Sequence, residues 1–154
     1  MNTPRMRVEL RRLVDAFFVA WAGNDWQTLR QHVSGDAVLL SNQHGKALGP
    51  TDIFAALGTD AGVAPMRIRT SNRYVATQGD HATACAYALA DRQGMAGHSL
   101  FGATVIFAFI RHNDVWKVTE VRLSVNWYQG ECREVSHWHN VPDDAGWKLG
   151  NPAP

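Results

Sequence analysis

The residues Phe101–Trp127, FGATVIFAFIRHNDVWKVTEVRLSVNW, decide the fold. They contain two runs rich in Val, Ile, Phe and Trp, each longer than ten residues, which are joined at His112–Asp114. Asn and Asp favour a tight turn because their short side chains hydrogen-bond the local backbone and tolerate a positive φ. The pattern predicts a long, strongly twisted β-hairpin, and its apolar surface needs a covering layer.

A helix near the N-terminus can supply that cover. Pro4 suits the first turn of a helix, and Gly23-Asn24 suits its end. Between them, large apolar residues recur at spacings of three and four, which is typical of a helix packed on a core: Leu10, Leu13, Val14, Phe17, Phe18 and Trp21.

Shorter elements follow this helix. We expect a second helix over Trp26–Val33, a short apolar strand over Ala37–Ser41, and a third helix after Gly49-Pro50. Two further alternating stretches, Met66–Thr77 and His81–Asp91, predict long strands. One face of the second stretch is entirely alanine, which permits close approach of a helix or a second subunit.

The order of these elements predicts an α+β fold with three helices, then four long antiparallel strands, and one short strand among the helices. A curved sheet wrapped around the first helix makes a cone with an open end. We expect one domain over residues 1–130 and an irregular tail over residues 131–154, where no periodicity is sustained.

Composition restricts the classes of partner. The 154 residues carry 15 Lys and Arg against 14 Asp and Glu, a net charge of +1, which argues against nucleic acid. No apolar run is long enough to span a membrane, and the N-terminus does not resemble a signal peptide. Cys85 and Cys132 lack metal-ligand spacing, so we expect free thiols in a cytoplasmic protein.

Five segments of the chain carry a family resemblance: LVDAFFVAWAGNDWQTLRQHV, GDAVLL, LGPTDIFAAL, YVATQGDHATACAYAL and RHNDVWKVTEVRLSVNW. Together, from about Val8 to Trp127, they resemble the NTF2-like superfamily, and within it the SnoaL-like proteins that include scytalone dehydratase-type and ketosteroid isomerase-type enzymes. The resemblance implies a site inside the cone, between the first helix and the concave sheet. Scytalone dehydratase-like enzymes carry Tyr-Asp near the end of that helix, where this chain has Trp21-Ala22.

The last strand offers a candidate acid–base pair. Glu120 and Arg122 share a parity with Asn126, so all three line the cone if that face turns inward. Glu120 could then abstract a proton beside a carbonyl, while Arg122 holds the oxyanion. The alternatives are an ion pair between neighbours, or the opposite, apolar parity of Val121 and Trp127 facing the core.

Other residues are candidates for the ligand walls and the cavity mouth. Trp21, Tyr87 and Trp127 could flank a flat hydrophobic ligand, although aromatic residues at core spacing are also ordinary core residues. Asn42 and His44 follow the short strand and could lie at the mouth, where His44 would be an acid or base near neutral pH.

These residues favour a cofactor-independent isomerase, dehydratase or cyclase that acts by proton transfer on a small hydrophobic carbonyl compound. The alternative is a non-catalytic domain that binds a small ligand or mediates assembly. His137 and His139 have no neighbouring Cys, Asp or Glu set that completes a metal site. Because both faces of Phe101–Ile110 are apolar, we also expect a homodimer through the outer sheet face.

Overall fold

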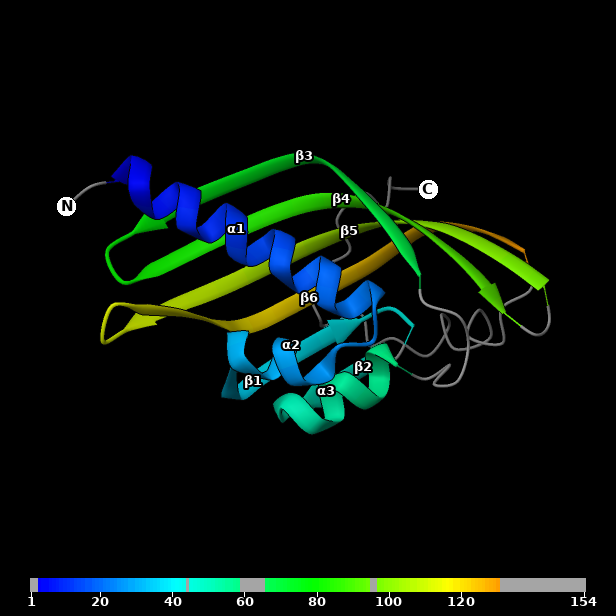
Figure 1. Cartoon of the computed structure of the whole chain (residues 1–154), viewed down its shortest axis with the longest axis horizontal. Helices are drawn as coiled ribbons and strands as arrows, with labels where there is room; N and C mark the ends of the chain where they lie inside the picture. The colour runs from blue at the N-terminus through cyan, green and yellow to red at the C-terminus, as the bar shows by residue number, and fades with distance from the viewer. Residues whose placement is uncertain (1–2, 44, 59–65, 95–96, 131–154) are drawn as a thin grey trace.

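The computed structural model describes residues 3–43, 45–58, 66–94 and 97–130. They form three helices and a six-stranded sheet (Figure 1). The elements are α1 (Thr3–Ala22), α2 (Trp26–His32), β1 (Val33–Ser41), β2 (Gly45–Leu48), α3 (Gly49–Leu57), β3 (Arg67–Gln78), β4 (His81–Gly94), β5 (Gly97–His112) and β6 (Val115–Gly130).

The sheet has the strand order β2-β1-β6-β5-β4-β3 and does not close on itself. Strands β3 to β6 pair antiparallel in chain order, whereas β1 pairs parallel with β6. The α+β architecture is therefore confirmed, with one strand more than expected. Strand β2 is only four residues long, begins at Gly45 and is followed by Gly49, so its sequence carries little strand signal.

The predicted hairpin is present as β5 and β6. Asn113 and Asp114 have φ angles of 52° and 61°, and the flanking residues His112 and Val115 are paired. A two-residue turn with two positive φ angles matches the right-handed twist of the strands, which explains why Asn-Asp stands there.

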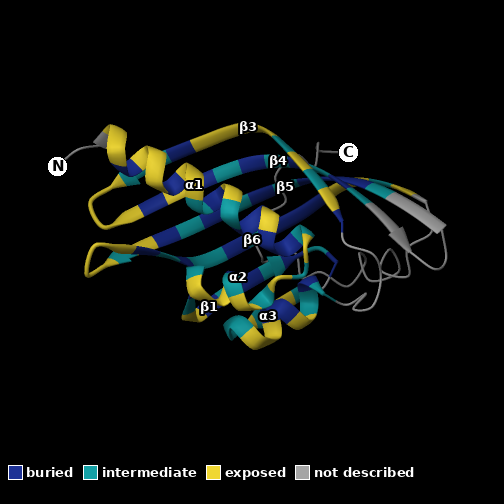
Figure 2. Cartoon of the chain, in the orientation of Figure 1, coloured by how far each residue is buried: buried dark blue, intermediate teal, exposed yellow. Residues whose placement is uncertain are grey.

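The core lies between α1 and the concave side of the sheet. Phe107 of β5 is fully buried, and its ring centroid is 5.0 Å from that of Phe17 and 5.6 Å from that of Phe18. All five alanines of β4 are buried as well, which lets α1 approach the sheet closely. Buried residues follow the middle of the strands and the inner side of α1, while the tips of the β3–β4 and β5–β6 hairpins are exposed (Figure 2).

Candidate functional site

The inward face of β6 changes parity along the strand. Val118 pairs with Phe109, but Glu120 pairs with the adjacent Ala108, so Thr119 is the extra residue of a β-bulge. The bulge places Val118 and Val121 on the same buried side. The prediction that the alternate residues from Trp116 to Asn126 share one face of the strand was therefore wrong.

Glu120 and Arg122 consequently lie on the outer face, opposite α1. Their side chains are 31% and 35% exposed, and Arg122 Nε is 3.3 Å from Glu120 Oε2. The pair is an ion pair between neighbours on one strand, outside the concave interior. A carboxylate at this place is not positioned to act on a molecule bound beneath α1.

Trp127 is also redirected by a bulge. Gly102 pairs with Trp127 and Ala103 with Val125, so Asn126 is the extra residue. Trp127 thus lies on the outer face, where its indole N–H donates to the Tyr87 hydroxyl over 2.7 Å. A Cβ at Gly102 would lie 2.2 Å from both side chains, so only glycine leaves room for this aromatic pair.

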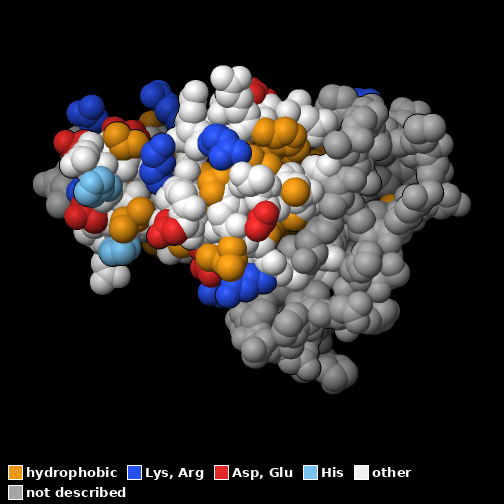
Figure 3. All heavy atoms as spheres, turned by 90° about the horizontal axis from the view of Figure 1, so that it is seen from below, with side chains coloured by type: hydrophobic (Ala, Val, Ile, Leu, Met, Phe, Trp, Pro, Cys, Tyr) orange, Lys and Arg blue, Asp and Glu red, His pale blue; other side chains and the backbone are white. Residues whose placement is uncertain are grey.

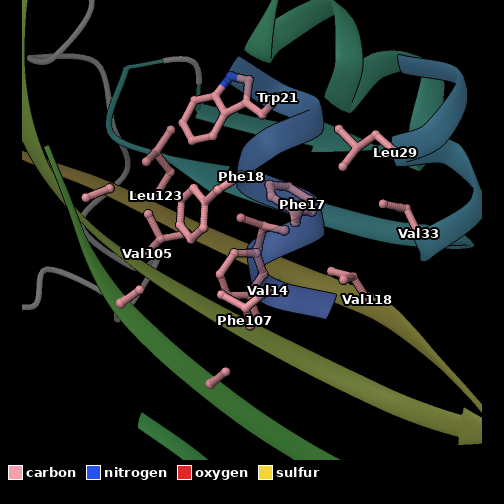
Figure 4. Close-up of a cluster of buried hydrophobic side chains, with 14 of the residues drawn as sticks. Val14, Phe17, Phe18, Trp21, Leu29, Val33, Val105, Phe107, Val118 and Leu123 are labelled. Carbon is pink, nitrogen blue, oxygen red and sulfur yellow. The ribbon is translucent and has the colours of Figure 1, made fainter. Parts of the chain in front are cut away.

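Trp21 does reach the interior. It is 4% exposed, lies nearly parallel to Phe18 at a centroid distance of 6.2 Å, and donates its indole N–H to the Leu57 carbonyl over 3.4 Å. In Figure 4, Trp21 and Phe18 extend from α1 toward Leu123 and Val105 of the sheet. Trp21 is therefore both a wall of the interior and a link between α1 and α3.

The two asparagines among the predicted ligand-binding residues bond within the protein. The Asn42 amide donates to the Val125 carbonyl over 2.9 Å and accepts from the Val125 N–H over 2.9 Å. Asn126 is exposed and donates to Thr104 Oγ1 over 2.9 Å. His44, His137 and His139 lie outside the described residues.

Two polar residues on the concave side were missed. Ser41 is 0% exposed and Gln43 is 5% exposed, and the Gln43 backbone N–H donates to Ser41 Oγ over 3.0 Å. They continue the inward parity of Ala37 and Leu39 in β1. That period-two pattern was the available signal, but it was hidden because the predicted strand stopped at Ser41.

Within the described part of the chain, no Asp, Glu, His, Lys or Arg side chain is fully buried. His32, at the end of α2, is half-buried, and the fold alters its pKa. Its pKa is lowered, first because burial disfavours the imidazolium and second because Lys117 repels it. Around Ser41 and Gln43 the concave side therefore combines apolar walls with neutral hydrogen-bonding groups, whereas Arg111, near the hairpin turn, contacts Met6 of α1 and pairs with Asp80.

Charges on the visible surface are mixed. Lys, Arg, Asp and Glu side chains are interspersed with hydrophobic ones on the face seen in Figure 3. Among the residues described, no group of three or more His, Cys, Asp or Glu side chains could hold a metal ion. No described helix is long and apolar enough to cross a membrane.

Solved structures with the same fold include several proteins with named activities. A hexachlorocyclohexane dehydrochlorinase from Novosphingobium barchaimii is 14% identical, with a TM-score of 0.74 over 84% of this chain and 92% of that one. A candidate scytalone dehydratase from Novosphingobium aromaticivorans is 14% identical, with a TM-score of 0.74 over 85% and 90%. An NTF2-like protein from Cytophaga hutchinsonii is 14% identical, with a TM-score of 0.67 over 81% and 99%.

At these identities the likeness shows the fold alone. No curated protein sequence matches the chain. The family comparison is more direct, because the model of the SnoaL-like domain matches residues 4–122, from the start of α1 to the middle of β6. The chain belongs to the SnoaL-like domain family.

Proposed function

We propose that the protein binds a small, largely apolar molecule on the concave side of the sheet, beside the Trp21 end of α1. The supporting observation is the make-up of that side. It presents apolar side chains from α1, β4, β5 and β6, together with the buried polar residues Ser41 and Gln43. Binding sites for small molecules are typically apolar with a few placed polar groups, and this combination matches that description.

Ser41 and Gln43 would orient the ligand by hydrogen bonds. A hydroxyl and an amide can donate to a carbonyl or accept from a hydroxyl, but neither is ionised near neutral pH. General acid–base catalysis needs a group whose pKa lies near the working pH. The described concave residues therefore favour binding and retention of a carbonyl compound over its conversion.

The test begins with the protein as purified. Small molecules released by unfolding are identified by mass spectrometry, and 2-acetylnaphthalene, a flat ketone, serves as a defined probe in a fluorescence titration. We expect one probe molecule per chain. Replacing Gln43 with Leu should weaken binding about fivefold, because one hydrogen bond contributes about 1 kcal/mol.

The matched control is Thr83→Val, which removes a hydroxyl from the exposed outer face of β4. It should leave probe affinity unchanged. Equal affinities for wild type, Gln43→Leu and Thr83→Val would contradict a ligand site beside Gln43.

Catalysis by proton transfer is the second candidate. It is supported by the names of the dehydrochlorinase and the candidate dehydratase that share this fold. The predicted acid–base residues are Glu120, Arg122 and His44, and Glu120 and Arg122 could serve only a substrate bound on the outer face. A screen for turnover of hydrophobic carbonyl compounds, compared with Glu120→Gln, separates this proposal from binding alone.

A further inference from the structure

Tyr128 brings a phenol to the concave side near the end of β6. It pairs with Phe101, a buried core residue of β5, and residues that are directly opposite on paired strands share one face of the sheet. The Tyr128 ring packs against the core, and its hydroxyl oxygen is buried. Of the other two tyrosines in the chain, Tyr74 is exposed and Tyr87 lies on the outer face. Tyr128 is therefore the tyrosine that belongs to the inner surface.

The bulge at Asn126 is what turns Tyr128 inward. An unbroken alternation after Val125 would place Tyr128 on the outer face, and the one extra residue moves it to the other side of the sheet. Tyr128 also lies beyond residues 4–122, which the model of the SnoaL-like domain matches. Membership of the family therefore assigns no role to this residue.

Tyr128 and Gln43 lie near the same end of the concave side, on neighbouring parts of the sheet. The Asn42 amide bonds both backbone groups of Val125, so Gln43, the next residue, lies close to the level of Val125. On β5, the partner of Tyr128 is two residues from the partner of Val125, a distance of about 7 Å along the strands. The two polar side chains thus begin at different levels of the inner surface, and the buried, apolar Val125 lies between them on β6.

Two separated polar groups favour a ligand with an oxygen at each end. Ser41 and Gln43 can bond a carbonyl oxygen at one end, as described above. A phenol hydroxyl has one donor and two acceptor sites, so Tyr128 can bond a ligand hydroxyl in either sense and still keep a bond within the protein. A hydroxyl suits this end better than a second carbonyl, because a carbonyl can only accept.

We propose that the ligand is a largely apolar molecule with an oxygen function at each end, a carbonyl held by Ser41 and Gln43 and a hydroxyl held by Tyr128. The inference rests on the function proposed above and narrows it, because that function needs only the first of the two contacts. Tyr128 is then the residue that selects ligands carrying the hydroxyl.

Two probes that differ by one hydroxyl test the inference. They are 2-acetylnaphthalene and 6-acetyl-2-naphthol, the same flat ketone with a hydroxyl on the far ring. Fluorescence titration gives both dissociation constants for wild type and for Tyr128→Phe, which removes the hydroxyl and keeps the ring. In wild type the naphthol should bind about fivefold more tightly, the contribution of one hydrogen bond. In Tyr128→Phe that advantage should vanish, while 2-acetylnaphthalene should keep its wild-type affinity.

Tyr87→Phe is the matched control, because it removes a phenol hydroxyl from the outer face. It should keep the advantage of the naphthol over the ketone. Gln43→Leu should keep that advantage too, because it removes a contact that both probes make. A purely structural role of Tyr128 would give a different result, since Tyr128→Phe would then weaken both probes equally. Circular dichroism reports whether each variant is folded.

Two results would overturn this inference and leave the proposed function standing. One is equal or weaker binding of 6-acetyl-2-naphthol than of 2-acetylnaphthalene by wild type, which needs no variant to fold. The other is an advantage of the naphthol that survives in Tyr128→Phe. If wild type binds neither probe, the proposed function is wrong, and this inference is wrong with it.

Discussion

Asn42 lies just beyond the end of β1, and its side chain extends the bonding to β6 past the last backbone hydrogen bond of β1. The amide bonds both the N–H and the carbonyl of Val125, while the Asn42 N–H donates to the Leu123 carbonyl. Asn42→Ala would leave both Val125 groups without this partner. We expect the free energy of unfolding to fall by about 1–3 kcal/mol in urea denaturation.

Asn126→Ala is the matched control, since that amide is exposed and donates to the Thr104 hydroxyl. A change within about 0.5 kcal/mol is expected there. If Asn42→Ala were equally mild, its amide would be free for another role, such as the ligand contact expected from the sequence.

His32 gives a pH dependence with a definite sign. Because the folded chain holds the pKa of His32 below its usual value near 6.5, the unfolded chain takes up a proton more readily. His32 therefore contributes stability that is complete above about pH 6.5 and is lost as the pH falls through the lower, folded-state pKa.

Urea denaturation of wild type and His32→Gln between pH 7.5 and 5 measures this effect. The stability of wild type relative to the variant should decrease as the pH falls. His81→Gln, an exposed histidine on β4, should keep the wild-type slope. A wild-type stability that rises relative to His32→Gln toward pH 5 would show that His32 gains a partner for its proton.

At the scale of elements, α1 is the part that closes the concave side. Phe17 is 1% exposed and contacts Phe18, Trp21 and Phe107, whereas Val19 on the same helix is 73% exposed. Phe17→Ala should lower the free energy of unfolding by about 3–5 kcal/mol, because it leaves a cavity in the core. Val19→Ala should change it by less than about 0.5 kcal/mol. Similar losses in both, measured by urea denaturation, would mean that α1 is not packed as described.

The helices and long strands were predictable because their residues repeat with periods of 3.6 and 2 over many residues. The sequence did not make it predictable which face of β6 turns inward. The deciding residues, Thr119 and Asn126, are the extra residues of two β-bulges. The position of a bulge depends on how β6 pairs with β5 rather than on the composition of β6. One extra residue reverses every later side chain, which moved Trp127 to the outer face.

The candidate site was therefore only partly predictable. Trp21 follows from the helical stripe and is confirmed in the interior. Ser41 and Gln43 could have been inferred from the alternation that begins at Ala37. The prediction instead named Asn42, which lies between them and has the opposite parity. Tyr87 and Trp127, predicted as walls of the cone, contact each other on the outer side of the sheet.

For the molecule as a whole, the sheet separates two surfaces with different chemistry. The concave side holds the apolar core with Ser41 and Gln43, and the outer side holds the Glu120–Arg122 ion pair and the Tyr87–Trp127 pair. The central claim is that ligand binding belongs to the first surface, while the pairing of copies through the second remains a prediction from the sequence. Substitutions on the two sides should therefore have separable effects.

The most direct measurement is the dissociation constant of 2-acetylnaphthalene for wild type, Gln43→Leu and Glu120→Gln, determined side by side by fluorescence titration. We predict about fivefold weaker binding for Gln43→Leu and unchanged binding for Glu120→Gln. The opposite pattern, with binding lost in Glu120→Gln and retained in Gln43→Leu, would place the site on the outer face and contradict the account.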